Sequence, residues 1–289
     1  MTTFAVAPPP PAPPAFPALP APPRLQWLRV FWTVLARDAR VLRREAVGLL
    51  IRSIMQPLAF TFVFTYLMPK IGLAGAPGQS GRAFSTVLVP GLLAITIALQ
   101  GINAVTMPLL LELQYTKEIE DRALAPAPVW LLGAEKIVFG AFQAAIGGLF
   151  VYPVVMLVHA KGHTPVVHVF NWPLFLVTVA LSCLLAGATG LLLGTMIDMR
   201  KAQMFFAIIV TPLTMLGCVY YPWATLAPVR WLQLLVLLNP VVYMSEGLRA
   251  SLTPQLAHMP VWGFLTALSV GTVVVSWFGI RSFVRRVVG

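Results

Sequence analysis

The chain has 289 residues, of which 58% are hydrophobic and only 10% are charged. Soluble domains carry roughly 25% charged residues, so this chain has too few charges to cover a water-soluble fold of its size. The composition excludes a typical cytosolic enzyme and indicates an integral membrane protein. The net charge of +11 does not indicate nucleic-acid binding, because the basic residues sit at the ends of long apolar runs.

Residues 1–23 contain ten of the 26 prolines and have no basic segment leading into an apolar stretch. This pattern predicts a disordered, partly polyproline-II tail rather than a signal peptide. The remaining residues, 24–289, are predicted to form one membrane domain.

Residues 24–46 have the periodicity of an amphipathic helix, with Leu28, Phe31 and Leu35 on one face. Arginines gather toward the other face, and we expect them to contact anionic lipid in the headgroup layer. A cytosolic helix that binds a partner protein is the alternative. The interfacial residues singled out are Arg29, Arg37, Arg40 and Arg44.

Six apolar runs are long enough to cross a bilayer, which takes about 17–25 residues of helix. The third run could be tilted, or broken around Gly147-Gly148. Two further pieces, 228–238 and 241–252, are too short to span, and Asn239-Pro240 separates them; such pieces suit re-entrant or interfacial helices. The predicted spans are 47–68, 86–108, 129–157, 172–197, 203–219 and 261–280.

The positions of Lys and Arg predict the orientation in the membrane. If the N-terminus is cytoplasmic, fifteen of the 20 basic residues fall on the cytoplasmic side and five on the other. This is a strong positive-inside bias. Both ends of the chain are basic, so both termini are predicted to be cytoplasmic and the number of spans even.

No catalytic motif is apparent in the sequence. There is no GxxxxGK[ST] phosphate-binding loop and no HExxH. Cys183 and Cys218 lie inside apolar runs and suit structural thiols. We therefore expect no enzyme activity, metal or cofactor in this chain by itself. Glu135 and Lys136, near the start of the third span, are expected to contact the segment ending at Pro128 or a partner subunit.

The polar segment 111–128 lies between the second and third spans, on the predicted cytoplasmic side. Its sequence predicts a short helix that ends at Pro126 and Pro128. Either it docks in a groove of a soluble partner or it is a solvated connector. The residues expected to make the contact are Tyr115, Lys117, Glu118, Glu120, Asp121 and Arg122.

The stretch from 220 to 252 combines interfacial aromatic residues with one acidic residue, Glu246, on the predicted external side. Glu246 and Arg249 are three positions apart on a probable helix and suit an ion pair. The pair either holds a hairpin together or contacts substrate, and we favour the first. The external residues singled out are Tyr221, Pro222, Trp223, Asn239, Pro240, Tyr243, Glu246 and Arg249.

Taken together, these features over residues 25–285 resemble the ABC-2-type membrane permeases of ATP-binding-cassette exporters. The resemblance rests on the amphipathic helix before Leu49-Leu50, the charged run Tyr115–Arg122, and the late stretch with Tyr221-Pro222 and Leu238-Asn239-Pro240. Within that family the sequence looks closer to drug and lipid exporters than to polysaccharide exporters.

The resemblance implies an all-α integral membrane fold with six transmembrane helices, an N-terminal amphipathic interfacial helix, a cytoplasmic coupling helix at 111–125 and an external re-entrant helical hairpin between spans five and six. It also implies a transporter in the cell (inner or plasma) membrane, built from two permease chains, most simply a homodimer. Two separate ATP-binding subunits would bind ATP and Mg²⁺. The cargo would be amphipathic: a drug, a lipid or a lipid-linked glycan.

Two alternatives come from other functional classes. An ion-coupled secondary transporter should carry acidic or His residues in mid-membrane, and none lies deep in a predicted span. A lipid-modifying enzyme would need polar residues converging at one interface, where only Glu246 and scattered histidines are available. A polysaccharide-exporting permease is the alternative within the family.

Overall fold

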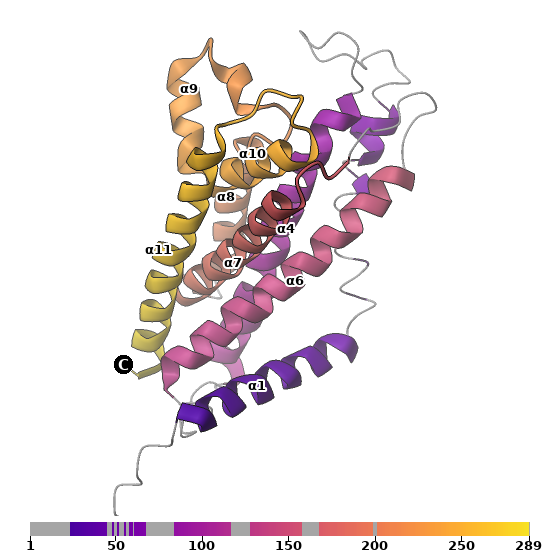
Figure 1. Cartoon of the computed structure of the whole chain (residues 1–289). Helices are drawn as coiled ribbons and strands as arrows, with labels where there is room; N and C mark the ends of the chain where they lie inside the picture. Colours follow the sequence, from indigo (N-terminus) through magenta and orange to yellow (C-terminus); the bar gives the residue numbers. More distant parts are fainter. Residues whose placement is uncertain are drawn as a thin grey trace, which may run out of the picture.

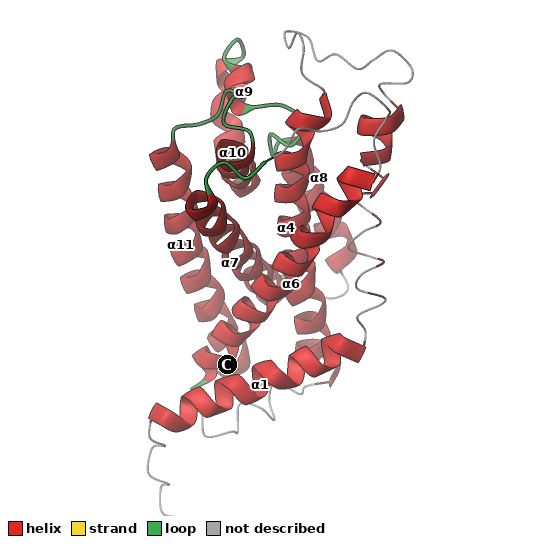
Figure 2. Cartoon of the chain, turned by 45° about the vertical axis from the view of Figure 1, so that its right-hand side comes forward, coloured by secondary structure: helices red, strands yellow, loops and turns green. Residues whose placement is uncertain are grey.

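The computed structural model describes residues 24–44, 48, 51, 55, 58–59, 61–67, 84–116, 128–157, 168–198 and 201–288. Every regular element in these ranges is helical (Figure 2). The long elements are α1 (Arg24–Arg44), α4 (Phe84–Leu111), α6 (Val129–Leu157), α7 (Trp172–Met196), α8 (Ala202–Met215), α10 (Pro240–Leu252) and α11 (Val261–Val288); the short ones are η1 (Phe62–Leu67), η2 (Glu112–Thr116), η4 (Trp223–Leu226), α9 (Arg230–Leu235) and η5 (Val236–Leu238).

Four helices form the body of the molecule, with α4 and α6 packed on α7 and α7 packed on α11 (Figure 1). Glycines on α7 allow the backbones to touch: a Cβ at Gly187 would lie 2.5 Å from the carbonyl oxygen of Ile137, and one at Gly190 would lie 2.8 Å from that of Ile102. Small residues serve this purpose in membrane helices, where packing replaces the hydrophobic effect.

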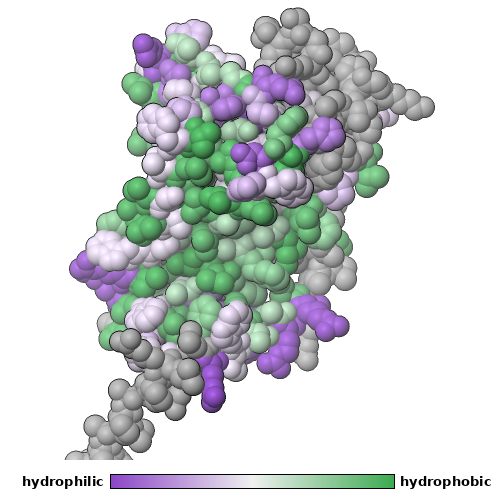
Figure 3. All heavy atoms as spheres, viewed as in Figure 1, coloured by the Kyte–Doolittle hydropathy of each residue, from purple (hydrophilic) through white to green (hydrophobic). Residues whose placement is uncertain are grey.

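The same four helices are long and apolar enough to cross a membrane, over Thr86–Gln114, Val129–Val151, Trp172–Met196 and Val261–Val288. A fifth span is possible if the bent pair Arg230–Leu238 and Pro240–Leu252 is counted as one. Figure 3 shows a broad apolar band on the viewed face between two ends where hydrophilic residues gather. The described part of the chain is thus a multi-pass bundle.

Four of the six predicted spans correspond to these helices. Spans two, three, four and six became α4, α6, α7 and α11, and α6 has the predicted bounds 129–157. The possible break at Gly147-Gly148 was wrong, because α6 is continuous there and both glycines face α4. The first predicted span falls largely outside the described residues.

The predicted fifth span, 203–219, is shorter in the structure. Helix α8 ends at Met215, with 14 residues, and the chain then bends through 216–221. The cause is tertiary: this bend runs against α4, where a Cβ on Gly91 would lie 2.1 Å from the Val219 carbonyl oxygen. With α8 short and the first span mostly undescribed, the number of six spans stays a prediction.

Helix α1 is amphipathic, as the sequence predicted, and packs against α6. Phe31, Leu35 and Leu42 are partly buried on its inner side. The predicted interfacial arginines Arg29, Arg37 and Arg40 are exposed on the other side; Arg44 is the last residue of the helix, and its side chain lies outside the described ones. The helix lies across the end of the bundle that also holds the C-terminus, and α9 lies at the opposite end (Figures 1 and 2).

Candidate functional site

The stretch 220–252, called the hairpin below, contains a bent helical pair in which α9 and η5 meet α10 at an angle of 99°. Its external, re-entrant placement in the membrane stays a prediction. Asn239 makes the bend: its Oδ1 accepts a hydrogen bond from the Val241 amide at 3.0 Å and caps α10, while Pro240 occupies the first helical position. The Asn239 Nδ2 donates to the Leu213 carbonyl at 3.0 Å. This residue pair therefore both starts α10 and ties the hairpin to α8.

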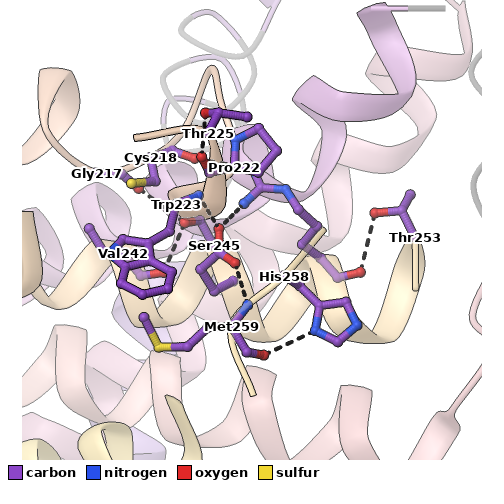
Figure 4. A network of polar contacts seen from close by, with 12 residues as sticks. Gly217, Cys218, Pro222, Trp223, Thr225, Val242, Ser245, Thr253, His258 and Met259 are labelled. Carbon is purple, nitrogen blue, oxygen red and sulfur yellow. Dashed lines mark hydrogen bonds and ion pairs between the residues drawn. The ribbon is translucent and has the colours of Figure 1, made fainter. Parts of the chain in front are cut away.

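Glu246 is the centre of a buried polar network, and Figure 4 shows part of this network around Trp223 and Met259. Its Oε1 accepts a hydrogen bond from the Trp223 amide at 2.9 Å and also binds the Arg249 guanidinium. Its Oε2 accepts from the Met259 amide at 2.8 Å. One carboxylate thus holds three parts of the chain: the start of η4, helix α10 and the loop before α11.

Arg249 is the countercharge, and the side chains of both ions have zero exposure to solvent. Arg249 Nη2 also donates to the Cys218 carbonyl at 3.1 Å, and Cys218 has a left-handed backbone with a φ of 50°. A buried ion is costly unless it is paired and hydrogen-bonded. The burial favours holding the hairpin over contacting substrate, since neither ion can reach a cargo molecule in this conformation.

The aromatic residues of the hairpin add further bonds to backbone carbonyls. The Trp223 indole donates to Gln233 at 3.1 Å, and the Tyr243 hydroxyl donates to Leu237 at 2.8 Å. Partial burial raises the pKa of the Tyr221 phenol, and its hydroxyl donates to the Met215 carbonyl at 3.4 Å. The Pro222 carbonyl accepts from the Thr225 hydroxyl at 2.6 Å. All eight residues that the sequence singled out here lie in one fixed hairpin.

At the opposite end, a charged cluster fastens α1 to the bundle. The Lys136 Nζ on α6 lies 3.2 Å from Asp38 Oδ2 on α1 and 2.9 Å from Glu112 Oε1 at the start of η2. Glu135, beside Lys136, is also buried. The expected contact of Lys136 with the segment 111–128 is confirmed at Glu112, whereas its second partner, Asp38 on α1, was not predicted. Asp38 was missed because nothing in the sequence near it marks a partner 98 positions away.

Replacing Lys136 with Met should release α1 from the bundle. The substitution removes the ammonium that joins Asp38 to Glu112, at a cost of about 2–3 kcal/mol for hydrogen bonds between charged groups. In hydrogen–deuterium exchange, we expect amides of α1 to exchange at least about tenfold faster while those of α7 stay protected. Arg43→Met, which removes an exposed charge from α1 itself, is the control. Equal protection of α1 in both variants would contradict the fastening role.

The predicted coupling segment is described only at its start. Tyr115 lies in η2, and its side chain is outside the described ones. Lys117, Glu118, Glu120, Asp121 and Arg122 fall outside the described residues, so their predicted role is untested. The flanking elements are placed: η2 contains Glu112 of the charged cluster, and α6 begins at Val129. The segment therefore leaves and re-enters the bundle at the end where α1 lies.

An apolar cavity of 680 Å³ lies between α4, α6 and α7, toward the end that holds the hairpin. Its walls include Leu93 and Ile97 on α4, Val151 on α6, and Phe175 on α7, with Leu252 from the end of α10. This volume lies within the range of small-molecule sites. In the described part of the chain, no three His, Cys, Asp or Glu side chains gather as metal ligands.

Comparison with known proteins identifies the family of the chain. The chain is 24% identical over 261 residues to the inner membrane transport permease YadH of Escherichia coli K12, covering 86% of this chain and 95% of the relative. The YadH proteins of Escherichia coli O157:H7 and Shigella flexneri match with the same identity and coverage. The family model of the ABC-2 type transporter matches residues 29–253, from the first turns of α1 to the end of α10. The chain therefore belongs to the ABC-2 type transporter family.

Proposed function

We propose that this chain is the membrane permease subunit of an ATP-driven exporter in the inner membrane. The observation that carries the proposal is the family match over 29–253, which takes in both the charged cluster at the α1 end and the hairpin with its buried ion pair at the other. The resemblance to YadH, an inner membrane transport permease, supports the location. The apolar cavity beside the hairpin supports an amphipathic cargo: a drug, a lipid or a lipid-linked glycan.

The energy source is a separate polypeptide. The chain has no phosphate-binding loop, and ABC-2 permeases work with ATP-binding subunits, which hold ATP and Mg²⁺. We propose two such subunits and two permease chains, as a homodimer. Their contact is the coupling segment around Glu118–Arg122, at the cytoplasmic end. Because Lys136 joins α1, η2 and α6 there, a movement of that segment would be transmitted to all three helices.

Co-purification tests the assembly. The tagged full chain is extracted from its native cells in mild detergent, its mass is measured and the bound proteins are identified. We expect a partner that carries a GxxxxGK[ST] loop, at two copies per two permeases. A chain that purifies alone, as a monomer and with no ATPase, would contradict the ATP-driven exporter. That result would favour an ion-coupled secondary transporter instead.

Replacing Glu118 and Asp121 together with Ala should uncouple transport from ATP hydrolysis in the purified complex. These acids are proposed to pair with the rim of a groove on the ATPase, and each lost pair at such a contact weakens it. We expect hydrolysis to continue while transport of the identified cargo falls at least about tenfold. Lys201→Ala is the control, since it removes an exposed charge that lies just before α8, outside the coupling segment. Unchanged transport in the double variant would contradict the coupling role.

A further inference from the structure

The outward face of α11 is apolar for several turns. Val270, Val273, Val274, Trp277 and Phe278 are all exposed large hydrophobic side chains. Their spacing of three and four residues places them on one side of the helix. Because α11 is also the least buried of the four long apolar helices, this stripe suits contact with the hydrocarbon of the bilayer.

The same face becomes basic one turn later. Arg281 and Arg285 follow Trp277 at intervals of four residues, and both are exposed. The Arg281 guanidinium lies over the Trp277 ring, 5.2 Å from its centroid. Arginine next to interfacial tryptophan marks the headgroup level of a membrane helix. The stripe therefore ends where lipid phosphates lie.

A cavity of 430 Å³ opens between α7 and α11 at this level. Leu192 and Met196 of α7 and Phe278 of α11 form its apolar walls, and Arg281, Ser282 and Arg285 supply its polar groups. One side of the cavity suits an acyl chain, while the other offers two guanidinium groups and a hydroxyl. None of these six lining residues is acidic.

The charge of this cavity is not balanced within the described part of the chain. Arg281 and Arg285 form no ion pair there, whereas the adjacent Arg286 binds Asp198 at 3.3 Å and the Thr195 carbonyl. Among the described residues, the acidic group near the cavity is Asp198, and it pairs with the neighbouring Arg286. Two guanidinium groups around a partly apolar cavity match a ligand that carries a phosphate and a hydrocarbon chain.

We propose that this cavity binds an anionic membrane phospholipid. The phosphate lies against Arg281, Arg285 and the Ser282 hydroxyl, and an acyl chain runs along Leu192 and Phe278. The lipid fills the cleft between the ends of α7 and α11, beside the contact that Arg286 makes across the same two helices. This site is separate from the proposed cargo path and does not depend on it.

Native mass spectrometry of the full chain tests the proposal. The protein is delipidated in detergent and titrated with phosphatidylglycerol or phosphatidylcholine of the same acyl chains. We expect wild type to retain phosphatidylglycerol preferentially. The variant Arg281→Gln/Arg285→Gln should bind it about thirtyfold more weakly, as expected for two basic residues at an anionic headgroup. Arg281→Lys/Arg285→Lys should recover part of the binding. It keeps both positive charges but loses the planar guanidinium groups, which can each donate two hydrogen bonds to a phosphate.

The matched control is Lys201→Gln/Arg230→Gln, which removes two exposed charges from α8 and α9. It should bind phosphatidylglycerol as wild type does, so a general loss of net charge is distinguished from loss of this site. Phe278→Ala removes part of the apolar wall proposed to contact the acyl chain and keeps both arginines. This variant should bind both phosphatidylglycerol and phosphatidylcholine more weakly. Equal retention of the two lipids by wild type, or unchanged phosphatidylglycerol binding by Arg281→Gln/Arg285→Gln, would overturn the proposal.

Discussion

Arg249→Met should lower the stability of the permease by about 3–5 kcal/mol, the usual cost of removing one partner of a buried ion pair. The Glu246 carboxylate would remain in a site with zero exposure, held only by the amides of Trp223 and Met259. Cys183 and Cys218 provide the readout, since both are free and buried. A thiol-reactive dye should report unfolding at a markedly lower temperature than in wild type.

Two further variants separate loss of charge balance from loss of packing. Arg230→Met removes an exposed arginine from α9 and should leave the unfolding temperature almost unchanged. Glu246→Gln/Arg249→Met removes both charges and keeps an oxygen that can accept from Trp223, so it should be more stable than Arg249→Met alone. If the double variant were the less stable of the two, the buried charge would not be what destabilises the single variant.

Gly91→Ala should have the second large effect, because one methyl group would collide with backbone. A Cβ at this position of α4 would lie 2.1 Å from the Val219 oxygen and 2.6 Å from its carbonyl carbon and Cα. Backbone cannot yield as a flexible side chain does, so the segment from 216 to 221 must move. That segment includes Cys218, whose carbonyl binds Arg249. We expect a loss of several kcal/mol, in the range of severe overpacking.

Gly271→Ala on α11 is the matched control for Gly91→Ala. It makes the same chemical change in another long apolar helix, but the nearest atom to its new Cβ is 3.7 Å away, an ordinary contact. Here we expect no loss and a small gain from the helix propensity of Ala. Measured by the same dye, a common unfolding temperature for the two variants would show that α4 and the 216–221 segment are not in backbone contact.

The helices were predictable wherever local signals decided them. The bounds of α6 follow from a long apolar run after Pro128, in which Glu135 and Lys136 are the only charged residues. The start of α10 follows from Asn239-Pro240, a cap followed by the residue suited to the first helical position. The Glu246–Arg249 pair was predictable because its members are three residues apart on one helix.

Other features depend on contacts between distant parts of the chain. The end of α8 at Met215 was not predictable, since the following segment turns to meet Gly91 on α4. The bond of Glu246 to the Met259 amide and that of Arg249 to the Cys218 carbonyl join loops whose sequence shows no sign of a partner. Lys136 was expected to contact the segment 111–128 and binds Glu112 there, but its partner Asp38 on α1 follows only from how the helices pack.

The separation of Asp38 from Lys136 has a consequence for biogenesis. Helix α1 is synthesised before the spans, yet the lysine that fastens it follows 98 residues later. At a translation rate of about 5–20 residues per second, roughly 5–20 s pass before that lysine exists. During this interval the nascent α1 must rest on the bilayer surface or on the insertion machinery. Docking of α1 therefore marks the point at which α4 and α6 have been inserted side by side.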